Sequence, residues 1–148
     1  MKKRLVALAL AASTAAGASE RRAAYTIPMV PNHFDYVQIP CRVEGVSAEL
    51  RCVIDTAALQ TSISDKVVRP DKGDERTQIF GATSSADVPS RKVVFTVAGQ
   101  KYRATCFLLR VDPRQEFDVL LGRDFLAAFS KVTLDFNRRT VTLEKEAT

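Results

Sequence analysis

The stretch Cys52-Val53-Ile54-Asp55-Thr56-Ala57-Ala58 decides the fold of this chain. It begins as an apolar run, typical of a buried strand, ends in a carboxylate and continues into small residues. Burying a carboxylate is costly, because desolvation penalises its charged form. Asp55 is therefore either a functional acid or a residue that caps a turn at the end of a strand.

Apolar and polar residues alternate on the N-terminal side of Asp55. This period of two predicts half-buried strands over residues 36–43 and 48–54, joined by a turn at Glu44-Gly45. A shorter strand is expected over residues 61–64, and a polar, charged segment follows over residues 69–76.

The second half of the chain continues the pattern of short strands and turns. Beyond a hairpin tip around Gly81, strands are expected at residues 91–97, 102–111, 117–121, 131–136 and 140–143. Gly122 ends a buried strand, and Asp124 is expected to cap a short helix that runs through Phe129. At least seven short strands and one short helix predict a small all-β barrel or sandwich.

The N-terminus has the pattern of a secretory signal peptide. A basic start, Met1-Lys2-Lys3-Arg4, precedes an apolar run over residues 5–12 and a small-x-small cleavage site at Ala16-Gly17-Ala18. The run is shorter than the roughly 20 residues of a membrane span, so no stable membrane insertion is expected after cleavage. An uncleaved amphipathic anchor is the alternative.

This pattern predicts three parts in a chain of 148 residues. Residues 1–18 are the signal peptide, residues 19–35 a loose N-terminal arm and residues 36–148 a single domain. The mature protein is expected to be periplasmic or secreted.

The charge of the chain does not indicate a nucleic-acid partner. The formal net charge is +5, but Lys2, Lys3 and Arg4 belong to the leader, which leaves about +2 in the mature chain. The other basic residues alternate with acidic ones, and no aromatic platform accompanies them.

Three cysteines, Cys41, Cys52 and Cys106, would lie in an oxidising compartment and permit one disulfide. Cys41 and Cys52 flank the first hairpin turn and could be cross-strand neighbours, while Cys106 could equally pair with Cys52. A cysteine nucleophile is not indicated, because the single histidine, His33, lies in a loop-like segment.

Other catalytic arrangements lack their sequence signatures. There is no nucleophile elbow, no metal-ligand spacing and no glycine-rich phosphate loop. No metal and no cofactor are therefore expected, and carboxylate chemistry at Asp55 remains.

Two motifs resemble those of the retropepsin-like aspartic proteases. Val53-Ile54-Asp55-Thr56-Ala57-Ala58 is similar to their active-site motif, an apolar pair followed by Asp-Thr/Ser-Gly-Ala. Val119-Leu120-Leu121-Gly122-Arg123-Asp124-Phe125-Leu126 resembles their second signature, and Ile79-Phe80-Gly81-Ala82 falls where they have a flap. The resemblance covers roughly residues 36–143. It implies an all-β retropepsin-like acid-protease barrel with a flap hairpin and one short C-terminal helix.

The resemblance also implies an activity and roles for individual residues. It implies an aspartic endopeptidase that acts on polypeptides as a homodimer, because one chain supplies one aspartate and the chemistry needs two. The implied roles are catalysis by Asp55, support of the dyad by Thr56, substrate binding by Ala57, Ala58, Phe80 and Gly81, and a structural signature at Gly122, Arg123 and Asp124.

Ala57 departs from the family pattern, which has glycine at that position. An alanine costs little where φ is negative and about 1 kcal/mol or more where φ is positive. The alternative function is therefore a non-catalytic peptide-binding pseudoprotease module in the periplasm. A monomeric β-domain without a site is a third possibility.

Overall fold

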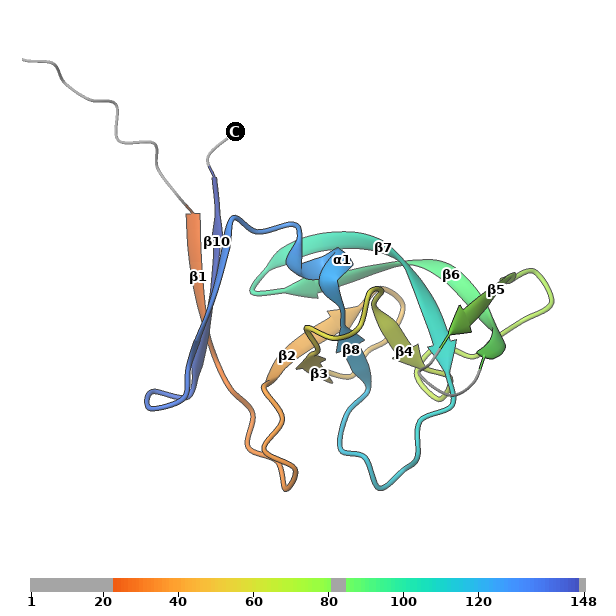
Figure 1. The fold of residues 1–148 in the computed structure, drawn as a ribbon, viewed down its shortest axis with the longest axis horizontal. Coiled ribbons are helices and arrows are strands. Elements are labelled where there is room, and N and C mark those ends of the chain that lie inside the picture. Colours follow the sequence, from red (N-terminus) through yellow and green to blue (C-terminus); the bar gives the residue numbers. More distant parts are fainter. Residues whose placement is uncertain (1–22, 81–84, 147–148) are drawn as a thin grey trace, which may run out of the picture.

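The computed structural model describes residues 23–80 and 85–146. Within them the chain forms ten strands and one short helix (Figure 1). In chain order the elements are β1 (Ala23–Pro28), β2 (Gln38–Val43), β3 (Leu50–Ile54), β4 (Ser62–Ser64), β5 (Glu75–Phe80), β6 (Ser85–Val97), β7 (Gln100–Leu109), β8 (Val119–Leu121), α1 (Arg123–Leu126), β9 (Lys131–Asp135) and β10 (Thr140–Lys145). No helix in the described part of the chain is long and apolar enough to cross a membrane.

The strands form two sheets. The larger has the order β2-β3-β8-β4-β7-β6-β5, and an additional pairing of β2 with β6 closes six of its strands into a barrel. The smaller has the order β1-β10-β9 and stands beside the barrel, on the left in Figure 1. The prediction of a small all-β barrel with one short helix is confirmed.

The core lies between the inward faces of the barrel strands and α1. Phe95, Tyr102, Phe125 and Phe129 form an aromatic cluster with ring centroids 5.1–5.8 Å apart. Such edge and offset contacts add to the free energy gained by burial. Phe125 is buried, so this cluster fixes the short helix against the barrel.

The predicted flap hairpin is present as β5 and β6. These strands pair antiparallel from Glu75 opposite Ser90 to Phe80 opposite Ser85. β6 is longer than the expected strand at residues 91–97, because its first half pairs with β5 and its second half with β7. Gly81, predicted at the hairpin tip, lies outside the described residues.

The prediction of a loose N-terminal arm is wrong for Ala23–Pro28. These residues form β1, which pairs antiparallel with β10 from Ala23 opposite Lys145 to Pro28 opposite Thr140. Ile27 is buried, and the free energy of that burial anchors the strand. The boundary between arm and domain stays a prediction.

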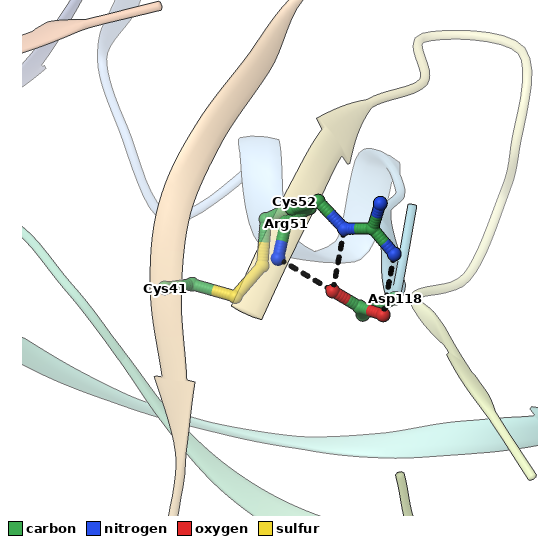
Figure 2. Close-up of a disulfide and its surroundings, with 4 residues drawn as sticks. All are labelled: Cys41, Arg51, Cys52 and Asp118. Carbon is green, nitrogen blue, oxygen red and sulfur yellow. Dashed lines mark hydrogen bonds and ion pairs between the residues drawn. A yellow bond between two sulfur atoms is a disulfide. The ribbon is translucent and has the colours of Figure 1, made fainter. Parts of the chain in front are cut away.

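The structure shows which of the two possible disulfides is formed. Cys41 on β2 and Cys52 on β3 are bonded, with their Cα atoms 6.0 Å apart (Figure 2). Cys106 on β7 is buried as a free thiol. The crosslink ties the strand that leads to Asp55 to its neighbour.

The Cys106 thiol is expected to be unreactive in the folded protein. Burial raises its pKa to about 12, with a further contribution from the negative charge of Asp124, so the reactive thiolate is scarce at neutral and mildly alkaline pH. Colorimetric thiol titration should show no free thiol in the native chain and one per chain after unfolding without reductant. Rapid labelling of the native chain would contradict this prediction.

Candidate active site

Asp55 lies at the C-terminal end of β3, in the middle of the larger sheet. β3 pairs with β2 on one side and runs parallel to β8 on the other. The Asp55 amide donates to the Leu121 carbonyl at 3.0 Å, and the Ile54 amide donates to the Val37 carbonyl at 2.9 Å. Hydrogen bonds to both neighbours therefore fix the backbone where the carboxylate begins.

The Asp55 carboxylate organises the loop between β3 and β4, residues 55–61, which we call the Asp55 loop. Its Oδ1 accepts hydrogen bonds from the amides of Ala57 at 2.9 Å and Ala58 at 3.2 Å. This is an Asx-type turn, one of the two roles that the sequence leaves open. The side chain is half-buried, and Oδ2 has no hydrogen-bond partner among the described residues. One oxygen shapes the loop, and the other remains available for chemistry.

Ala57 does not strain this loop. The non-glycine residues with positive φ in the described part of the chain are Asp35, Ala98 and Arg139, and Ala57 is not among them. Its side chain is exposed. An alanine is therefore compatible with the backbone where the family motif has glycine.

The second signature holds the Asp55 loop in place. The Arg123 amide donates to the Ala58 carbonyl at 2.9 Å, and the Asp124 amide donates to the Leu59 carbonyl at 3.3 Å. The start of α1 thus satisfies two carbonyls of the loop. The two motifs quoted from the sequence meet in space, although more than 60 residues separate them.

Gly122 lies against the backbone of the same loop. A Cβ atom built on Gly122 would be 2.6 Å from the Gln60 carbonyl carbon and 2.9 Å from its oxygen. Real Cβ atoms essentially never approach backbone this closely. Gly122 is therefore needed for the close approach of α1 to the loop.

Asp124 does not cap α1, and that prediction is wrong. The N-cap is Gly122, without a side-chain capping bond. The Asp124 carboxylate lies within the first turn of α1, where Oδ1 accepts hydrogen bonds from the Phe125 amide at 2.8 Å and, across the loop, from the Thr61 amide at 2.9 Å and the Thr61 hydroxyl at 2.8 Å. The helix also ends at Leu126, before the expected Phe129.

Thr61 is a supporting residue that the sequence reasoning missed. It is fully buried, and its Oγ1 accepts a hydrogen bond from the Gly122 amide at 3.2 Å while donating to Asp124. The sequence carries no distinct signal for this role, which depends on burying the hydroxyl beside residues about 60 positions later in the chain.

An ion pair between Arg51 and Asp118, which the sequence did not indicate, joins the N-terminal ends of β3 and β8. Asp118 accepts hydrogen bonds from the Arg51 backbone amide at 2.9 Å, from Nε at 3.1 Å and from Nη2 at 3.2 Å (Figure 2). The Asp118 amide donates back to the Arg51 carbonyl at 2.9 Å. With the disulfide, this pair fixes β3 to both neighbours.

The remaining predicted site residues lie at the surface. Thr56 is exposed, Ala58 is half-buried, and Phe80 at the end of β5 is 78% exposed. Leu59, in the Asp55 loop, is 72% exposed. No hydrogen bond joins Asp55 to a second carboxylate in residues 23–80 or 85–146. Within one described chain, Asp55 is a single acid beside exposed apolar side chains.

Comparisons with known proteins agree with this geometry. A family model described as retroviral aspartyl protease matches residues 76–148. A crystal structure of a retropepsin-like aspartic protease from Rickettsia conorii matches with a TM-score of 0.60 and 14% identity, covering 86% of this chain and 95% of that one. The chain has the retropepsin-like aspartic protease fold. The resemblance to the retropepsin-like aspartic proteases is confirmed, and the matched family model begins after the Asp55 motif.

A second solved structure gives the same retropepsin-like fold. It is the foamy viral protease-reverse transcriptase in complex with an RNA/DNA hybrid, with a TM-score of 0.52 and 20% identity. The alignment covers 68% of this chain and 13% of that one. No curated protein matches the sequence.

Proposed function

We propose that this retropepsin-like protein is an aspartic endopeptidase, active as a homodimer in which Asp55 of each copy forms one half of a catalytic dyad. The observation that carries the proposal is the state of Asp55 in a single chain. One carboxylate oxygen is held by the loop, the other has no partner among the described residues, and the side chain is half-buried at the end of a fixed strand.

The proposed reaction needs two carboxylates that share one proton. Like charges about 3 Å apart cannot both ionise, so one acid of the dyad stays neutral. The ionised carboxylate takes a proton from a water molecule, whose oxygen attacks the carbonyl carbon of the peptide. The neutral acid gives its proton to the carbonyl oxygen, which forms a neutral diol intermediate. The acid that took the water proton then gives it to the nitrogen as the C–N bond breaks, while the other carboxylate takes a proton from a hydroxyl of the intermediate, so the dyad again holds one proton. No metal or cofactor takes part in these steps.

The surface around Asp55 supports a second copy and a peptide. Leu59 and Thr56 lie exposed in the Asp55 loop, where a second copy would bury them on the two-fold axis. In this arrangement Thr56 links the two loops, and Ala57 and Ala58 contact the peptide. Phe80, exposed at the end of β5, contacts the peptide, which binds as an added strand.

An extracytoplasmic location completes the proposal. The leader over residues 1–18 has the pattern of a secretory signal, and the Cys41–Cys52 disulfide is typical of proteins in oxidising compartments. We propose that the mature chain is periplasmic or secreted.

The direct experiment is cleavage of a peptide library by the mature chain over a range of pH, with products located by mass spectrometry. Activity should be highest at acidic to mildly acidic pH, where the dyad holds its single proton. Absence of any cleavage across this range would overturn the proposed activity.

Replacing Ala57 with glycine is expected to change kcat/KM by less than about tenfold. The reason is that Ala57 has no positive φ and an exposed side chain, so its methyl group imposes no backbone strain. Steady-state kinetics on one cleaved peptide would measure the ratio. A wild-type chain that is inactive beside an active Ala57→Gly variant would favour the pseudoprotease alternative instead.

A further inference from the structure

The larger sheet closes into a barrel at β2, and this closure is short. β2 pairs with β6 only through Arg42 and Val43. Residues 38–41 of β2 have β3 as their only strand neighbour in the described part of the chain. We call β2, with its pairings to β6 and β3, the seam of the barrel. A strand that few backbone pairings hold is among the first parts of a sheet to open.

The disulfide crosses this seam to the strand that carries Asp55. In the register of β2 and β3, Cys41 lies opposite Leu50 and Cys52 lies opposite Ile39, so the two cysteines are diagonal neighbours. Their Cα atoms are 6.0 Å apart (Figure 2). Cys52 precedes Asp55 by three residues. The crosslink therefore holds the seam closed close to the proposed catalytic residue.

The pairing of β2 with β3 also holds the backbone beside Asp55. The Ile54 amide donates to the Val37 carbonyl at 2.9 Å. The Asp55 carboxylate in turn accepts hydrogen bonds from the amides of Ala57 and Ala58. Separation of β2 from β3 would release one side of the strand that positions Asp55 and would disturb the loop that follows.

Two separate thiols fit this part of the core poorly. Cys41 is 3% exposed and Cys52 is 0% exposed, and both belong to the hydrophobic core. Unbonded sulfur atoms cannot approach within bonding distance, so two thiols need more space than one disulfide. Because protein cores are densely packed, the reduced pair is expected to push β2 away from β3.

Once formed, the bond is protected from reduction. Thiol–disulfide exchange requires a thiolate to attack a sulfur atom, so its rate depends on access. The burial of Cys41 and Cys52 denies that access while the chain is folded. Cys106, on β7, is a buried thiol and is equally out of reach of an external disulfide.

Resting on the proposed peptidase function, we propose that the Cys41–Cys52 bond is a one-way activation switch for Asp55. The newly made chain is reduced and its seam is open, and the chain becomes active when a disulfide-bearing oxidant forms the bond. One cysteine thiolate attacks the oxidant's disulfide and releases one thiol, and the second cysteine then displaces the other sulfur of the oxidant. The two cysteines lose two hydrogen atoms in total, and the oxidant gains them as two thiols.

The test compares the reduced and oxidised forms of the mature wild-type chain. The chain is unfolded in urea with dithiothreitol, and then one half is refolded with dithiothreitol and the other half with oxidised and reduced glutathione. A crosslink across a sequence separation of 11 raises the folding equilibrium constant by about 10²-fold. The oxidised half should therefore cleave the best library peptide with a kcat/KM at least about tenfold above that of the reduced half. Equal activity of the two halves would overturn the switch.

Two variants show whether this bond is the cause. Cys106→Ala keeps only Cys41 and Cys52, so it should lose and regain activity as the wild type does. Cys41→Ala/Cys52→Ala cannot form the bond and should have the same activity in both buffers. A gain of activity on oxidation of this double variant would overturn the switch. Rapid loss of activity when the folded, oxidised wild type is placed in dithiothreitol without urea would overturn it as well.

A measurement that needs no cleavage separates the switch from the chemistry. If the oxidised wild type shows no Asp55-dependent cleavage, the proposed function fails. Hydrogen exchange of the Ile54, Ala57 and Ala58 amides, followed by nuclear magnetic resonance, should still be at least about tenfold faster in the reduced chain than in the oxidised chain. Equal protection of these amides in the two forms would overturn the switch while the peptidase stands.

Discussion

Replacing Asp55 with asparagine is expected to abolish peptide cleavage, lowering kcat/KM by at least about 10³-fold. An amide at this position can neither take a proton from water nor share one with the opposite acid. The fold should persist, because asparagine Oδ1 can still accept the hydrogen bonds from the amides of Ala57 and Ala58. Cleavage of the best library peptide by each protein gives the ratio.

The matched control is Asp135→Asn. Asp135 lies at the end of β9 in the smaller sheet and accepts a hydrogen bond from the Arg138 amide at 2.8 Å, which asparagine can also accept. This variant should cleave at the wild-type rate. Full turnover by Asp55→Asn would show that the carboxylate does no chemistry and serves only the turn.

Replacing Gly122 with alanine is expected to destabilise the chain by about 3 kcal/mol. The added Cβ would lie 2.6 Å from the Gln60 carbonyl carbon, and backbone cannot move aside as a flexible side chain can. The Gly122 amide also donates to the Thr61 hydroxyl, so moving Gly122 disturbs the hydrogen bonds by which the start of α1 holds the Asp55 loop. Urea unfolding should show the lower stability, and cleavage activity should fall with it.

Gly73→Ala is the control for this substitution. A Cβ on Gly73 would meet only a side-chain oxygen of Asp71 at 3.2 Å and no backbone atom. Its free energy of unfolding should stay within about 0.5 kcal/mol of wild type. Equal stability of the Gly122 and Gly73 variants would contradict the close approach of α1 to the loop.

The sequence predicted the features of the fold that depend on residues close together in the chain. Alternation located β2, β3 and β10, because the inward residues at every second position of these strands are buried apolar side chains. The break between the strands expected at residues 91–97 and 102–111 is the turn at Ala98-Gly99, and both residues have the positive φ that such a hairpin turn requires. Both motifs of the site are continuous stretches of sequence, although the contacts between them are not.

The features that the sequence missed depend on pairs of residues that are distant in the chain. β1 looked like a loose arm because its partner, β10, comes more than 100 residues later. Asp124 looked like a helix cap because the buried Thr61 that holds its carboxylate is 63 residues away. Gln38 is a polar residue of an alternating strand, yet it is buried, and its side chain donates to the Glu116 carbonyl 78 residues away.

The most direct test of the shared dyad is to mix wild-type and Asp55→Asn chains in equal amounts at constant total concentration. The chains are dissociated, allowed to re-associate, and assayed on one peptide. If each site needs Asp55 from both copies, random pairing leaves about one quarter of the wild-type activity, because only that share of dimers carries two aspartates. Activity of about one half would mean that each chain holds a complete site and would contradict the shared dyad.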